Sequence, residues 1–158
     1  MQGIELCRRF YVEIIEPLMK NNFPSAAYSA ALLGPGSEVL GYDTEMSRDH
    51  DWGPRVYLFL QEPDWGLSRE IRELLVRQVP EHFYGFPVDT RMTVITTVPR
   101  FIKSCLSVDI NKPLEPVDWL TFPSQTLLEI TGGEVHHGLY LAAHRSGRTF
   151  DAPRGVYR

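Results

Sequence analysis

Residues 55–61 read Arg-Val-Tyr-Leu-Phe-Leu-Gln, a nearly continuous apolar and aromatic run. Such a run is typical of a β-strand that lies inside a sheet and is buried on both faces. An amphipathic helix is predicted next, over residues 68–79, with Ser68 as its N-cap and Pro80 at its end. Residues 92–98 are rich in β-branched side chains and predict another strand. This strand–helix–strand order indicates an α/β or α+β domain.

The flanking segments extend this pattern. Apolar residues at three- and four-residue spacing predict a helix over residues 4–19, which Pro17 should kink or end. Residues 28–33 are short, apolar and followed by Gly and Pro, which favours a strand. Further helices are predicted over residues 99–106, around 118–120 and across 124–130. We therefore expect an α/β (α+β) fold, a small mixed sheet flanked by helices.

The expected organisation is one core over residues 1–122, followed by a short helix and a tail over residues 123–158. From Gly132 onward the sequence offers few side chains that could pack, which predicts an extended or poorly ordered tail. His136 and His137 are adjacent in this tail, and neighbouring side chains are not expected to converge on one metal ion.

Composition narrows the function. The chain has 158 residues, 43% of them apolar, and a formal net charge of −4, which argues against a general nucleic-acid binder. Cys7 and Cys105 are too few for a disulfide framework and are expected to be reduced thiols. With no signal-peptide pattern and no long uncharged apolar run, we expect a cytoplasmic protein without a membrane partner.

Two motifs before residue 55 suggest chemistry. Asp49 and Asp51 stand two residues apart at the start of the strong strand, so on a strand both carboxylates would point to the same face. A divalent cation would relieve their mutual repulsion, and Mg²⁺ prefers one or two carboxylates together with phosphate oxygens. Gly36 allows a phosphate to approach the backbone, and Ser37 can donate its hydroxyl and amide. Either motif alone is usually a solvated turn; their combination favours a phosphate and metal site.

Arg55 closes this stretch. It is a candidate for bidentate binding of a phosphate, and the alternative is a surface arginine that balances the charge of the aspartates. A P-loop would need a Gly-Lys-Ser/Thr triplet, which the sequence lacks.

The order of these motifs resembles the nucleotidyltransferase superfamily. Its pattern is an apolar residue, Gly-Gly or Gly-Ser, a spacer of about ten residues and then Asp-x-Asp or Asp-x-Glu leading into a strand. Here eleven residues separate Ser37 from Asp49. The longer string from Leu32 to Arg55 resembles the bacterial DUF4037 family, described as nucleotidyltransferase-like. Further matches are Asp118-Trp119-Leu120, Pro123-x-Gln125 and Thr131-Gly-Gly-Glu-Val135.

The resemblance implies Mg²⁺-dependent nucleotidyl transfer, with Mn²⁺ as a possible substitute. Gly36 and Ser37 would hold the triphosphate of a nucleoside triphosphate, and Asp49 and Asp51 would bind two metal ions. An unidentified small-molecule or protein acceptor would attack the α-phosphate and release pyrophosphate. The superfamily places a third carboxylate on a neighbouring strand.

The sequence departs from the superfamily pattern at three points. The residue between the aspartates is normally apolar and is His50 here. For the third carboxylate, Asp89 and Asp109 are both candidates. The resemblance fades after about residue 138. Members of the family continue there into a helical second half, so we expect residues 123–158 to be the truncated start of such a half. The alternative is therefore a catalytically degenerate domain that binds a nucleotide or a partner, and a plain structural domain comes third.

Overall fold

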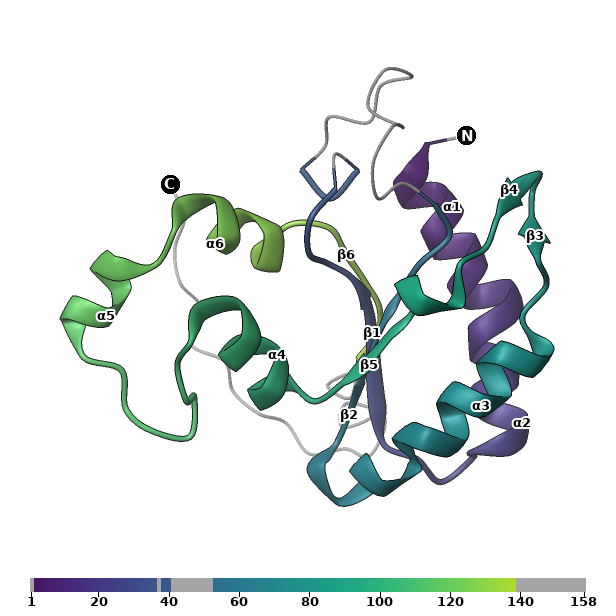
Figure 1. The fold of residues 1–158 in the computed structure, drawn as a ribbon, viewed down its shortest axis with the longest axis horizontal. Coiled ribbons are helices and arrows are strands. Elements are labelled where there is room, and N and C mark those ends of the chain that lie inside the picture. Colours follow the sequence, from purple (N-terminus) through teal and green to yellow (C-terminus); the bar gives the residue numbers. More distant parts are fainter. Residues whose placement is uncertain (1, 37, 41–52, 139–158) are drawn as a thin grey trace, which may run out of the picture.

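The computed structural model describes residues 2–36, 38–40 and 53–138 (Figure 1). Its elements are, in chain order, α1 (Gly3–Phe10), the π-helical η1 (Tyr11–Ile15), α2 (Glu16–Asn22), β1 (Tyr28–Leu32), β2 (Tyr57–Leu60), the 3-10 helix η3 (Glu62–Leu67), α3 (Ser68–Gln78), β3 (His82–Phe83), β4 (Phe86–Pro87), the 3-10 helix η4 (Thr90–Met92), β5 (Val94–Thr96), α4 (Val98–Leu106), α5 (Pro116–Thr121), α6 (Ser124–Thr131) and β6 (Glu134–His137).

The main sheet has four strands in the order β5-β2-β1-β6. β1 runs antiparallel to both β2 and β6, whereas β2 and β5 are parallel. A separate two-stranded sheet pairs β3 with β4. The fold is thus α+β with a small mixed sheet, which confirms the prediction of the fold class.

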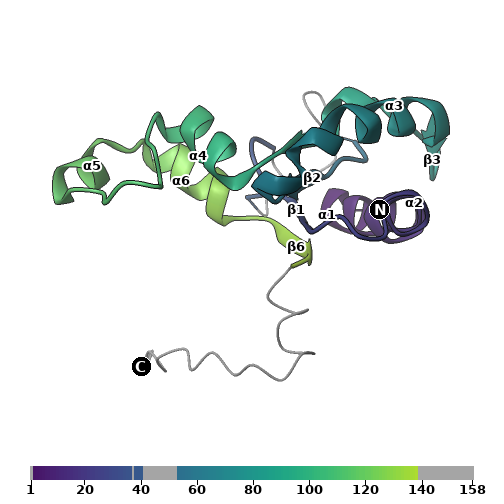
Figure 2. The ribbon, with the colours of Figure 1, turned by 90° about the horizontal axis from the view of Figure 1, so that it is seen from below.

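Helices cover both faces of the sheet. Successive side chains of β2 point to opposite faces of the sheet. Leu58 and Leu60 pack toward α1–α2 and α3, whereas Phe59 lies on the other face and packs against Phe101 of α4. Figures 1 and 2 show α1, α2 and α3 on one side of the strands and α4, α5 and α6 on the other. Because β2 has buried side chains on both of its faces, it lies at the centre of the core. Complete burial of a side chain such as Leu58 stabilises the fold by roughly 1.5–3 kcal/mol.

Most helices begin and end close to the predicted positions, with two corrections. Pro17 does not end the first helical run. The π-helical η1 continues into α2 at Glu16, whose N–H bonds to the Tyr11 carbonyl, and Pro17 follows within the first turn of α2. The prediction of Ser68 as an N-cap is wrong: η3 runs directly into α3, the N-cap residue is Leu67, and no side chain caps the helix.

The prediction of an extended or poorly ordered tail needs a correction at Glu134–His137, which are extended but packed against the sheet. These residues form β6, which pairs with β1 and so extends the sheet at its edge. The pairing has a register shift between Ala30 and Ala31, and the side chain of His136 is fully buried and stacks on Tyr11 at 5.6 Å. Backbone pairing with a neighbouring strand, rather than an apolar face of its own, gives this segment its structure. Residues 139–158 lie outside the described ranges.

Candidate functional site

Four strand ends meet at one end of the sheet. Because β1 is antiparallel to β2 and β6, and β2 is parallel to β5, the C-terminal end of β1 lies beside the starts of the other three strands. Leu32 pairs with Glu134, Ala31 with Tyr57, and Tyr57 with Val94. The topology therefore brings together the glycine turn after β1, the segment that follows Asp51, and the segment that contains Asp89.

The turn after β1 packs closely against the start of β2. Gly34 and Gly36 have φ values of 84° and 145°, which L-residues with side chains rarely adopt. A Cβ added at Gly36 would collide with the guanidinium of Arg55 and would lie 2.8 Å from the carboxylate oxygens of Glu38. Position 36 therefore favours glycine, because the Arg55 and Glu38 side chains occupy the space that a side chain at this position would need.

A buried ion pair closes this turn. The Arg55 Nη2 atom lies 2.6 Å from Glu38 Oε1, and the two side chains are 5% and 1% exposed. The same nitrogen donates a short hydrogen bond to the carbonyl of Pro35. Arg55 is therefore not a surface arginine; its guanidinium joins the start of β2 to the turn. Sequence reasoning missed Glu38, because nothing in a polar, turn-prone segment marks one carboxylate as buried.

Ser37, Asp49 and Asp51 lie outside the described residues. The chain is described again from Gly53, two positions after Asp51. The Gly53 carbonyl accepts a hydrogen bond from the Cys7 thiol at 3.4 Å, and a Cβ at Gly53 would have the Pro87 carbonyl within 3.9 Å. The segment that follows Asp51 thus passes between α1 and the residues just before Asp89.

The two candidates for a third carboxylate occupy different places. Asp89 is the N-cap of η4, the short 3-10 helix that leads into β5 at the end of the sheet described above. Hydrogen bonds from the Arg91 side chain lower the pKa of the Asp89 carboxyl below its ordinary value, so it is ionised at neutral pH. Asp109 is exposed in the loop between α4 and α5, where it accepts hydrogen bonds from Asn111. That loop lies on the far side of α4 from the sheet (Figures 1 and 2).

An open hollow of about 180 Å³ borders the turn. It is lined by Pro35, Arg55, Tyr57, Met92 and Val94. Its walls are mostly apolar, and Arg55 is the one charged residue among those that line it. A hollow of this kind, beside a glycine turn, suits the less polar part of a ligand whose charged part lies at the turn.

Within the described ranges, no group of three or more His, Cys, Asp or Glu side chains could hold a metal ion. Asp49 and Asp51 fall outside these ranges, so the prediction of a metal site there stays a prediction. None of the described helices is long and apolar enough to cross a membrane. Comparison with protein-family models, with curated proteins and with solved structures gives no match to this chain.

Proposed function

We propose that this chain is a nucleotidyltransferase-type domain that binds a nucleoside triphosphate with Mg²⁺ at the end of the sheet where β1 ends and β2 begins. The observation that carries the proposal is the contact of Pro35 and Glu38 with Arg55. These residues bracket Ser37, Asp49 and Asp51 in the sequence. Both ends of the segment with the predicted phosphate and metal ligands are thereby tied to one place.

Each residue has a role in the proposed reaction. The backbone amides at Gly36 and Ser37 and the Ser37 hydroxyl would donate hydrogen bonds to the phosphates. Asp49 and Asp51 would hold the Mg²⁺, and a metal ion there would neutralise the charge that develops as pyrophosphate leaves. A small-molecule or protein acceptor supplies the oxygen that attacks the α-phosphate.

Asp89 is the better candidate for the third carboxylate. Its carboxyl group is ionised, and it precedes β5. In addition, the carbonyl of nearby Pro87 lies close to Gly53, and Gly53 follows Asp51 by two residues. To serve as a metal ligand or base, it would have to exchange its ion pair with Arg91, whose Nη2 lies 2.7 Å from Asp89 Oδ2.

A second candidate function is a degenerate domain that binds a nucleotide without turnover. The composition of β5 favours it, because Val94, Ile95 and Thr96 include no acid, and the Asp89 carboxylate is already paired with Arg91. Release of pyrophosphate from a bound nucleotide would separate the first function from the second.

Thermal unfolding with ATP, GTP, CTP or UTP and Mg²⁺ tests the proposal. A ligand at a hundred times its dissociation constant stabilises the folded state by about 2.7 kcal/mol, which for a domain of this size raises Tm by about 5–11 °C. We expect this rise in the wild type and not in Asp49→Ala or Asp51→Ala. Glu70→Ala removes an exposed carboxylate from α3 and is the matched control. No rise with any nucleotide, or an equal rise in the aspartate variants, would refute the proposal.

A further inference from the structure

Two backbone hydrogen bonds tie the turn after β1 to the last turns of α6 and to the diglycine that follows this helix. The Gly34 N–H donates to the Glu129 carbonyl at 2.8 Å, and the Gly133 N–H donates to the Val39 carbonyl at 3.1 Å. Residues that are about a hundred positions apart in the sequence thus hold both ends of the turn that contains Gly36.

The approach of these two backbones leaves no room for side chains. A Cβ at Gly132 would lie 2.8 Å from the Val39 carbonyl oxygen, and a Cβ at Gly133 would collide with the Leu32 carbonyl. Gly133 also has a φ of 79°. By contrast, Gly85 has a φ of 83° and a Cβ there would meet nothing within 4 Å. Gly133 therefore combines an unusual backbone conformation with a contact that Gly85 lacks.

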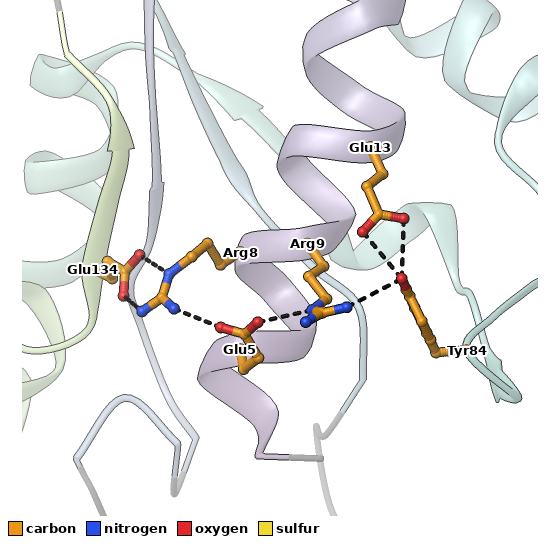
Figure 3. Close-up of polar contacts among 6 residues, drawn as sticks. All are labelled: Glu5, Arg8, Arg9, Glu13, Tyr84 and Glu134. Atoms are coloured by element: carbon orange, nitrogen blue, oxygen red, sulfur yellow. Dashed lines mark hydrogen bonds and ion pairs between the residues drawn. The ribbon is translucent and has the colours of Figure 1, made fainter.

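The segment that carries these glycines is itself fixed to the first helix. Arg8 of α1 donates from Nε to Glu134 Oε1 at 2.6 Å and from Nη2 to Glu134 Oε2 at 2.5 Å (Figure 3). Glu134 directly follows Gly133 and pairs with Leu32 across the sheet. The buried Val39 packs with Cys7 of α1 and with Leu32. The turn is thus supported from β6 and from α1.

We propose that Gly132 and Gly133 are positioning residues of the nucleotide site. They fix the backbone at Gly34–Gly36 and at Val39, on both sides of Ser37, and they act through Leu32 and Val39 without touching the ligand. This inference rests on the proposed function. It assigns a structural role to the two glycines of Thr131-Gly-Gly-Glu-Val135, which the sequence motif alone does not reveal.

The test compares Gly133→Ala with Gly85→Ala, a control that introduces the same backbone strain away from the turn. Both variants are assayed at a temperature at which circular dichroism shows them folded. We expect Gly133→Ala to speed amide hydrogen exchange at Gly34 and to weaken binding of the stabilising nucleotide with Mg²⁺ by between about tenfold and a hundredfold. Gly85→Ala should change neither quantity. Gly132→Ala, whose φ is not in the left-handed region, is the milder variant if Gly133→Ala does not fold.

Two results would overturn the inference in different ways. If Gly133→Ala, or Gly132→Ala in its place, binds the nucleotide as tightly as the wild type, the positioning role is refuted and the proposed function stands. If the wild type binds no nucleotide, the proposed function fails and the positioning role falls with it.

Discussion

Replacing Arg55 by methionine would remove the cation that pairs with the buried Glu38 carboxylate. The two side chains are 5% and 1% exposed, so water cannot take over the role of the guanidinium. Removing one partner of a buried ion pair costs about 3–5 kcal/mol. For a domain of this size that corresponds to a fall in Tm of roughly 6–20 °C.

Urea unfolding of the wild type, Arg55→Met, Glu38→Leu and the double variant measures this cost. Because replacement of a buried pair by apolar residues is often nearly neutral, the double variant should be more stable than Arg55→Met alone. Arg69→Met breaks the exposed pair with Glu73 on α3 and should leave stability unchanged. A loss below about 1 kcal/mol in Arg55→Met, or strictly additive effects, would refute the reasoning.

Three further changes test the core and the buried polar groups. Leu75→Ala should lower the free energy of unfolding by about 2–5 kcal/mol in urea titrations, whereas the exposed Val76→Ala should change it by less than about 0.5 kcal/mol. Tyr11→Phe removes a buried hydrogen bond of 3.1 Å to the Tyr28 hydroxyl and should cost about 1–3 kcal/mol by the same measurement, with a smaller added cost once Tyr28 is also phenylalanine. Burial lowers the pKa of the His136 imidazole below its ordinary value of 6.5. As the pH falls, the unfolded chain is therefore protonated before the folded protein, so the free energy of unfolding should be highest above about pH 6.5 and decrease below it. Unfolding at a series of pH values should show this decline in the wild type, and equal slopes for His136→Gln would contradict it.

Local sequence patterns predicted the elements that contain a continuous apolar run or an apolar stripe along one face. β2 and α3 show a continuous apolar run and a clear apolar stripe, and they lie where the sequence indicated. The turn of the β3–β4 hairpin depends on positive φ values at Tyr84 and Gly85, and the first of these is uncommon for a residue with a side chain. No residue pattern marks β6, whose structure comes from its pairing with β1.

The candidate site was predictable in its motifs and not in its contacts. The spacing from Gly36 to the aspartates can be read along the chain, whereas the burial of Glu38 depends on Arg55 and becomes visible only in the folded structure. The sequence also left both Asp89 and Asp109 as candidates for the third carboxylate. The parallel pairing of β2 and β5 separates them, because Asp89 comes just before β5 and Asp109 comes after α4.

The most direct test of the proposed site uses Mn²⁺ in place of Mg²⁺, since a paramagnetic ion broadens the NMR signals of nearby amides. With Mn²⁺ and a nucleoside triphosphate, we expect the amide signals of Gly34, Gly36 and Gly53 to broaden, while those of α5 stay sharp. The broadening should disappear in the Asp49→Ala/Asp51→Ala variant. Sharp signals at the glycines, or broadening that survives in this variant, would contradict a nucleotide and metal site at this end of the sheet.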